Sequence, residues 1–282
     1  MRNGLVLFTS DRGITPARAA RAAEEAGFDT FYVPEHTHIP VRRDAAHPGT
    51  GDESLPDDRY LRTLDPWVAL ATAAAVTEWI RLSTAVALPV EHDPITLAKT
   101  IATLDHLSGG RVTLGAGFGW NTDELADHDV PAGRRRTVLR EYLEAMRALW
   151  TQDEASYDGE FVSFGASWAW PKPAQPHVPV LVGAGGGPKT FRWIAANADG
   201  WMTTPIETGI GGKADELRKA WADAGRAGEP QVHVLVARKP TAVDVAEWAA
   251  AGVDELIWGV PDADEATVLA SITRLGAKVA GG

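Results

Sequence analysis

A histidine-containing segment follows a short apolar run near the start of the chain. Residues 33–38 read Val-Pro-Glu-His-Thr-His. An imidazole titrates near neutral pH, so His36 at the end of a strand can exchange a proton with a bound ligand, and Glu35 beside it is a second candidate for proton transfer. His38 is more typical of a surface histidine. We therefore expect His36 to take part in chemistry at this strand end.

The same histidine pair is also compatible with a metal hydrolase. Such a site needs further histidine and aspartate ligands at other strand ends. The corresponding segments offer the glycines of 183–187, the threonines at 203 and 204, and Gly259 instead. The sequence therefore predicts no metal site.

Alternating glycines mark a second candidate segment. Residues 113–121 read Thr-Leu-Gly-Ala-Gly-Phe-Gly-Trp-Asn. Glycines at alternate positions remove side chains from one face of a strand, which lets a ligand approach the main chain. Trp120 adds a large apolar surface with one N–H donor. The segment is typical of a cofactor site, with layering of a barrel core as the alternative.

A third segment resembles a phosphate-binding loop. Residues 183–190 read Gly-Ala-Gly-Gly-Gly-Pro-Lys-Thr, but Pro188 stands where the Walker A pattern has glycine, so nucleotide hydrolysis is not predicted. A glycine-rich turn into a helix still presents N–H groups to an anion. A tight turn with proline at the first helical position is the alternative. The arginine run 134–136 would bind an anionic tail if it faces this loop, and otherwise forms a solvated helix face.

Strand and helix patterns alternate along the chain and must position these segments. The expected strands are 5–8, 30–34, 81–88, 112–115, 178–183, 200–203, 232–237 and 255–260. The expected helices are 15–26, 66–77, 94–106, 135–150, 188–197, 212–225, 241–251 and 264–276. Three helices begin with a capping residue followed by proline, at Thr15, Asp65 and Asp93.

Eight strand–helix units predict an α/β fold, a single (β/α)8 TIM barrel over 1–282. A doubly wound open sheet is the alternative, but it usually carries a glycine fingerprint after its first strand, which residues 11–13 (Asp-Arg-Gly) lack. Working residues of such barrels lie on the loops after the strands. We expect long insertions at about 37–64 and 152–177 on that face, with Trp168 and Trp170 as an apolar lid.

Composition and charge indicate which classes of partner and which compartment to expect. The chain has 282 residues, a formal net charge of -11 and no cysteine. An acidic surface repels phosphate backbones, so nucleic-acid binding is not expected. A chain without cysteine fits a reducing cytoplasm. The sequence shows neither a signal peptide nor an apolar stretch that could span a bilayer, so we expect a cytoplasmic protein without a membrane partner.

In their order and spacing, these segments resemble the luciferase-like monooxygenase superfamily, specifically its deazaflavin branch in actinobacteria. The resemblance spans essentially the whole chain. Its most specific parts are residues 32–36, 85–89, 94–105, 107–111 with 115–120, and 179–183 with 198–201.

The resemblance implies coenzyme F420 as the cofactor, with FMN as the alternative. It places the tricyclic ring near the ends of the third and fourth strands, with a non-proline cis peptide bond between Ala85 and Val86 behind it. His36 matches the residue near the reactive edge of the ring. The matching cofactor contacts are Gly117, Phe118 and Gly119 with Trp120 on the fourth strand, and Gly185, Gly186, Gly187 and Thr190 at the loop for the tail.

One departure narrows the chemistry. Deazaflavin sugar-phosphate dehydrogenases of this superfamily carry a catalytic glutamate at the position of Trp120. Proton transfer then falls to His36, Glu35 or Glu124. The resemblance implies an oxidoreductase that passes a hydride between reduced coenzyme F420 and an apolar or conjugated small molecule. It also implies that the protein forms a homodimer. A reduced-FMN monooxygenase using dioxygen and a non-catalytic cofactor-binding barrel are the alternatives.

Overall fold

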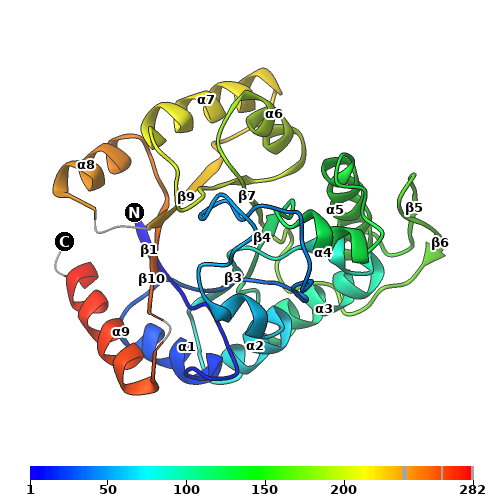
Figure 1. Cartoon of the computed structure of the whole chain (residues 1–282). Helices are drawn as coiled ribbons and strands as arrows, with labels where there is room; N and C mark the ends of the chain where they lie inside the picture. The colour runs from blue at the N-terminus through cyan, green and yellow to red at the C-terminus, as the bar shows by residue number, and fades with distance from the viewer. Residues whose placement is uncertain (237–239, 262, 281–282) are drawn as a thin grey trace.

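Eight parallel strands close into a barrel in the order β1-β10-β9-β8-β7-β4-β3-β2, with helices around it (Figure 1). The computed structural model describes residues 1–236, 240–261 and 263–280. The barrel strands are β1 (Arg2–Val6), β2 (Thr30–Val33), β3 (Arg81–Thr84), β4 (Val112–Gly117), β7 (Val180–Gly183), β8 (Gly200–Met202), β9 (Gln231–Val236) and β10 (Glu255–Gly259). The predicted (β/α)8 barrel is confirmed, and the open sheet is excluded.

The eight predicted helices are present, with ends that differ by a few residues. They are α1 (Pro16–Glu25), α2 (Pro66–Ala74), α3 (Pro94–Leu107), α5 (Arg135–Thr151), α6 (Pro188–Asn197), α7 (Ile210–Asp223), α8 (Ala242–Ala250) and α9 (Glu265–Ala280). The side chains of Thr15, Asp65 and Asp93 each accept a backbone N–H three residues ahead. These bonds satisfy amides that a helix start leaves open, and the following proline suits the first helical position.

All eight predicted strands differ from the observed ones by one to four residues at their ends, and β1 and β3 differ most. β1 begins at Arg2, earlier than the expected residue 5, because Arg2 pairs with Glu255 at the start of β10. β3 ends at Thr84, where 81–88 was expected, because the chain turns at the cis peptide bond between Ala85 and Val86. That bond lies where the resemblance placed it. The strand expected over 232–237 ends in Ala237, which lies outside the described residues.

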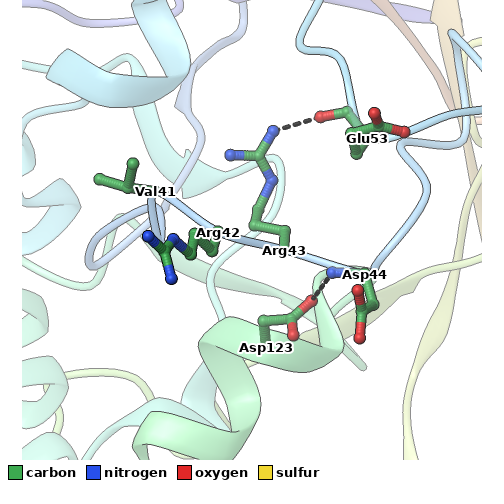
Figure 2. Close-up of a pocket in the computed structure, with 6 residues that line it drawn as sticks. All are labelled: Val41, Arg42, Arg43, Asp44, Glu53 and Asp123. Carbon is green, nitrogen blue, oxygen red and sulfur yellow. Dashed lines mark hydrogen bonds between the residues drawn. The ribbon is translucent and has the colours of Figure 1, made fainter.

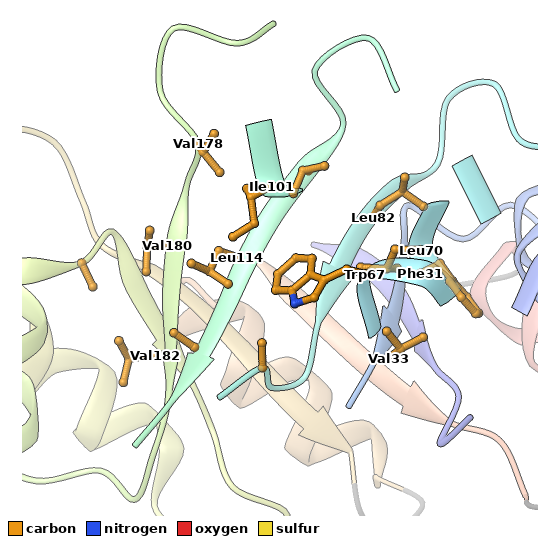
Figure 3. Close-up of a cluster of buried hydrophobic side chains, with 14 of the residues drawn as sticks. Phe31, Val33, Trp67, Leu70, Leu82, Ile101, Leu114, Val178, Val180 and Val182 are labelled. Carbon is orange, nitrogen blue, oxygen red and sulfur yellow. The ribbon is translucent and has the colours of Figure 1, made fainter. Parts of the chain in front are cut away.

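Most of the apolar core lies between the strands and the helices. In Figure 3, side chains of neighbouring strands, among them Leu82, Leu114 and Val180, lie beside Trp67 of α2 and Ile101 of α3. Successive strand residues point to opposite sides, so these side chains face outward while their neighbours fill the barrel.

The inside of the barrel is layered. A buried apolar layer consists of Tyr32, Leu181, Met202 and Ile257, with the partly exposed Val6, Ala85, Val86 and Leu235 packed against it. Near the amino ends of the strands, the Tyr32 hydroxyl donates to Glu255 Oε1 at 2.9 Å and lies 2.9 Å from His233 Nδ1. Burial, together with Arg2 and Arg81, lowers the pKa of His233 to about 3, so this residue is a neutral part of the polar floor.

The two long insertions differ in position. Residues 37–64 contain the short helix η1 (Asp58–Arg62) and join the carboxyl side of the barrel through a bridge between Ser10 and Thr63. Residues 152–177 were expected there too, and this was wrong: they form the hairpin β5 (Ala155–Asp158) and β6 (Ser163–Ser167), which packs along α5 on the flank of the barrel (Figure 1).

The tryptophans of the second insertion therefore form no lid. The side chains of Trp168 and Trp170 are 77% and 58% exposed, and the main chain at Trp170 accepts from Lys99 of α3. None of the helices in the described ranges combines the length and apolarity needed to cross a bilayer.

Candidate functional site

A buried histidine–glutamate pair lies at the carboxyl ends of β2 and β4. His36 Nδ1 is 2.8 Å from Glu124 Oε2, and the two side chains are only 7% and 0% exposed. The Glu124 oxygen also accepts from Asn121 Nδ2 at 3.3 Å. A carboxylate that accepts from Nδ1–H fixes the tautomer and orientation of an imidazole, which leaves Nε2 free to exchange a proton with a ligand. His36 is thus a candidate general acid or base.

Glu124 is positioned by a helix that we did not predict, α4 (Thr122–Asp127). The Asn121 side chain caps this helix, and Asp123 and Glu124 lie in its first turn. An asparagine followed by acidic residues is a helix-start signal, so this element was readable from the sequence. The partnership with His36 was not, because it joins residues 88 positions apart.

Glu35 lies beside His36 after β2, as expected, but its carboxylate is bonded within the protein. Its Oε1 lies 2.7 Å from His92 Nε2, and its Oε2 accepts the Leu88 N–H at 2.5 Å. Burial lowers the pKa of His92, but the hydrogen bond and charge of Glu35 outweigh it and raise this pKa overall. Since both oxygens of the carboxylate are engaged, Glu35 tethers the segment after β3, and His36 is the stronger candidate for proton transfer.

Aromatic rings from the first insertion and from the segment after β4 lie around His36. The ring centroid of His36 is 5.4 Å from that of Tyr60 and 5.7 Å from that of Trp120. His47 packs edge-on against both, at 5.1 Å and 4.8 Å, and its Nε2 is 3.1 Å from the Tyr60 hydroxyl. Burial, with the neighbouring His36 and Arg43, lowers the pKa of His47. His47 and Tyr60 were not among the predicted site residues, because no local sequence pattern shows which strand end a long insertion will contact.

Val86 forms part of the apolar floor of the mouth, and two glycines make room for it. A methyl group on Gly117 would lie 2.7 Å from Val86 Cγ2, and one on Gly183 would lie 2.4 Å from Val86 Cγ1. The glycines of β4 and β7 therefore allow the segment after β3 to pack inside the barrel. This assigns a packing role to Gly117, beside the cofactor contact that the resemblance implies.

A substitution at Gly183 tests this packing. Gly183→Ala is expected to destabilise the fold by about 1–3 kcal/mol through overpacking against Val86. Adding Val86→Ala should recover most of that loss, because it removes the methyl groups that clash, and neighbouring residues couple in such cycles. Urea unfolding of the two single variants and the double variant measures the coupling. Gly185→Ala is the control, since a methyl group there meets no atom within 4 Å; strict additivity of the pair would contradict the contact.

The glycine loop after β7 leads into α6 without a side-chain cap. Gly185 and Gly187 have open space around them, whereas the Gly186 N–H donates to Glu207 Oε2 at 3.0 Å. Glu207 is also paired with Lys213 of α7. Among the described residues, the loop therefore presents the uncapped start of α6 to a ligand, while the Gly186 amide is already engaged.

Only one arginine of the run 134–136 reaches this loop. Arg136 Nη2 donates to Thr190 Oγ1 at 3.2 Å, and its guanidinium lies 4.5 Å from the centroid of the Phe118 ring. Within the described part of the chain, Arg136 has no carboxylate partner. Arg134 pairs with Glu160 on the hairpin, and Arg135 donates to a backbone oxygen. The Phe118 side chain thus points toward the helices, so only its main chain is available to the mouth.

Two cavities have linings that do not include His36, Glu124 or the glycine loop. Figure 2 shows one of about 370 Å³ between the first insertion and α4, where Asp123 accepts from the Asp44 N–H and Arg43 donates to the Glu53 carbonyl. Its lining is almost wholly charged, which does not suit a flat ring. The other, about 310 Å³, lies outside the barrel between the first turns of α2 and α3. In the described residues, no group of three or more histidine or acidic side chains is placed to hold a metal ion.

The chain is similar in sequence and in structure to several known proteins. An uncharacterized protein of Mycobacterium tuberculosis is 68% identical over 280 residues, which cover 99% of each chain. The F420-dependent glucose-6-phosphate dehydrogenase of Amycolatopsis mediterranei is 31% identical over 217 residues, 74% of this chain and 59% of that protein. The solved structure of the monooxygenase RslO1 from Streptomyces bottropensis superimposes with a TM-score of 0.69 at 27% identity, covering 83% of this chain and 70% of that one.

The family model of the luciferase-like monooxygenases matches residues 15–277, which include His36, Glu124, Trp120 and the glycine loop. The match therefore includes every barrel strand except β1, together with the loops at their carboxyl ends. The chain belongs to the luciferase-like monooxygenase family.

Proposed function

We propose that the chain is an F420-dependent oxidoreductase that transfers a hydride between coenzyme F420 and an apolar or conjugated organic molecule. The observation that carries this proposal is the buried His36–Glu124 pair, at the same barrel face as an apolar floor and an anion-accepting loop. The 31% identical F420-dependent relative supports the choice of cofactor.

The residues present fit such a cofactor. Val6, Ala85, Val86 and Leu235 are half-buried at the mouth and offer a flat ring an apolar surface. The uncapped start of α6 and the Arg136 guanidinium suit an anionic tail. Bound F420 would supply or accept the hydride at its ring, and the protein would provide position and exclusion of water.

The protein residues then have separate roles. His36 would hold or release the proton that accompanies the hydride, at Nε2, while Glu124 keeps Nδ1–H bonded. Trp120, Tyr60 and His47 form a wall of rings that favours flat, weakly polar substrates. Trp120 offers no carboxylate where the sugar-phosphate dehydrogenases have their acid, so sugar phosphates are not proposed as substrates.

The glycine loop suits a cofactor tail that continues outward. A terminal phosphate, as in FMN, ends the molecule, whereas the phosphate in the F420 tail is a diester whose chain continues. Glu207 occupies the Gly186 amide and neutralises Lys213. Arg136 and the exposed Lys189 are left without a carboxylate partner among the described residues, and both can meet an anionic tail. Of the two, Arg136 is the one held in place by the fold, through Thr190 and the Phe118 ring.

Removing that cation tests the placement of the tail. Arg136→Ala is expected to weaken F420 binding by about 10- to 100-fold, since a hydrogen bond between charged groups contributes about 1.5–3 kcal/mol. Arg134→Ala removes the same charge from an exposed pair with Glu160 and should leave the dissociation constant unchanged. Calorimetric titration of both variants gives the comparison, and equal losses would remove Arg136 from the site.

Turnover tests the function itself. Reduced F420 should be oxidised in the presence of conjugated ketones, quinones or other flat acceptors, without consumption of dioxygen. Oxygen uptake with reduced FMN would instead support a monooxygenase, the activity named for the structural neighbour. A protein that binds F420 but oxidises it with none of these acceptors would be a carrier.

A further inference from the structure

Two buried carboxyl groups, Glu91 and Glu124, meet at Thr37, and the charge of a third, Glu35, acts on Glu91. Glu35, Glu91 and Glu124 are 4%, 6% and 0% exposed, and they lie just after β2, in the short helix η2 (Pro89–Glu91) and in α4. Glu35 is paired with His92, and Glu124 with His36. Glu91 has no cation within ion-pair distance among the described residues. The mechanism above gives this buried acid no role.

The donors around Glu91 and Glu124 differ in number. Glu91 Oε2 accepts from the Thr37 hydroxyl at 3.0 Å, but its Oε1 is buried without a donor among the described residues. Glu124 accepts from the Thr37 N–H at 3.0 Å, from Asn121 and from His36. Two adjacent ionised carboxylates would leave Glu91 Oε1 unsatisfied and place like charges side by side. A proton on Glu91 removes the like-charge contact and turns one of its oxygens into a donor, for which Glu124, bonded to the same Thr37, is the adjacent carboxylate.

The electrostatics of the cluster agree with this assignment. Burial and the charge of Glu124 raise the pKa of Glu91 to about 9, with a smaller contribution from Glu35. The other titratable groups at this cluster are His36, His92 and the half-buried His128, whose pKa is lowered by burial and by His38. Glu91 is therefore neutral near pH 7.

We propose that Glu91 and Glu124 act as a proton-sharing carboxyl pair that positions His36. Glu91 holds the proton and donates it in a hydrogen bond to Glu124, and the charge of Glu124 holds His36 by Nδ1–H. The inference rests on the proposed function in one respect, the transfer of a proton between His36 and a bound substrate. When His36 gives its Nε2 proton to a substrate and becomes neutral, the Glu124 charge stays compensated by Glu91, Asn121 and the Thr37 N–H. Glu91 is a positioning residue, since it touches no reacting atom.

The pair also has a hydrogen-bonded connection to the surface. The Thr37 hydroxyl lies 2.9 Å from His128 Nε2 and 3.0 Å from His38 Nδ1, and Thr37 and His38 are exposed. The shared proton can therefore exchange with solvent through Thr37, His38 and His128, even while cofactor and substrate cover the mouth.

Paired amide substitutions test the proposal without any cofactor. Glu91→Gln replaces a neutral acid with a neutral amide of similar shape, and should leave the fold and the His36 environment intact. Glu124→Gln removes the charge that holds His36, and should destabilise the protein. In ¹H–¹⁵N spectra of the histidine side chains, a bonded Nδ1–H signal of His36, assigned by its loss in His36→Gln, should persist in Glu91→Gln and be lost or shifted in Glu124→Gln.

Thermal unfolding against pH supplies a second readout. Glu91 has a pKa of about 9 when folded and an ordinary one of 4.5 when unfolded, so its contribution to stability is greatest below pH 4.5 and declines as the pH rises toward 9. The melting temperature of Glu91→Gln should therefore rise relative to the wild type between pH 5 and pH 8. Equal destabilisation by both substitutions at every pH, or loss of the His36 signal in Glu91→Gln, would overturn the proposal. These measurements stand even if the protein prefers FMN or turns over no acceptor.

Discussion

Replacing His36 with alanine is expected to reduce turnover by about 10²- to 10⁴-fold while the protein stays folded, the range typical of losing a general acid or base. Hydride transfer to a conjugated acceptor leaves a site that needs a proton, and His36 Nε2 is the group that the Glu124 contact leaves free for it. Single-turnover oxidation of reduced F420 with saturating acceptor measures this step apart from binding.

His106→Ala is the matched control for this experiment. His106 lies exposed in the last turn of α3, at the opposite end of the barrel, and should have no effect on the rate. Near-normal turnover in His36→Ala with an unchanged circular dichroism spectrum would remove His36 from the chemistry.

The largest expected effect on stability comes from Gly115→Ala. A methyl group at this position in β4 would lie 1.9 Å from the Thr84 carbonyl oxygen, which belongs to the backbone and cannot move aside alone. The same two residues are joined by hydrogen bonds of 2.7 Å and 3.1 Å through the Thr84 hydroxyl. We expect a loss of about 3–5 kcal/mol in the free energy of unfolding, at the upper end for single substitutions.

Urea unfolding of the soluble fraction measures this loss. Gly165→Ala in the exposed strand β6 is the control, because a methyl group there meets no atom within 4 Å, and it should be neutral or slightly stabilising. A stable Gly115→Ala variant would show that β3 and β4 lie farther apart than described.

The barrel could be predicted from the sequence because its signals are local. Proline after a capping residue fixes helix starts at Pro16, Pro66 and Pro94, and the alternation of strand and helix fixes the topology. The first strand was placed too late because its start is polar. Arg2 belongs to the polar floor of the barrel, where its Nε lies 3.3 Å from Glu255 Oε2.

The candidate site was only partly predictable, since its contacts join distant segments. His36 was found from its place after a strand. Its partner Glu124, the rings of His47 and Tyr60, and the engagement of Glu35 by His92 depend on how loops cross the mouth. The hairpin in 152–177 was misplaced for the same reason: length alone does not say whether an insertion covers the mouth or a flank.

The central claim is that this barrel face binds F420 in preference to FMN. Equilibrium titration of the apo-protein with each cofactor, followed by tryptophan fluorescence, tests it most directly. We expect tighter binding of F420 than of FMN. The fluorescence response should be weaker in Trp120→Phe, because Trp120 lies at the mouth beside His36. Tighter binding of FMN, or no binding of F420, would contradict it.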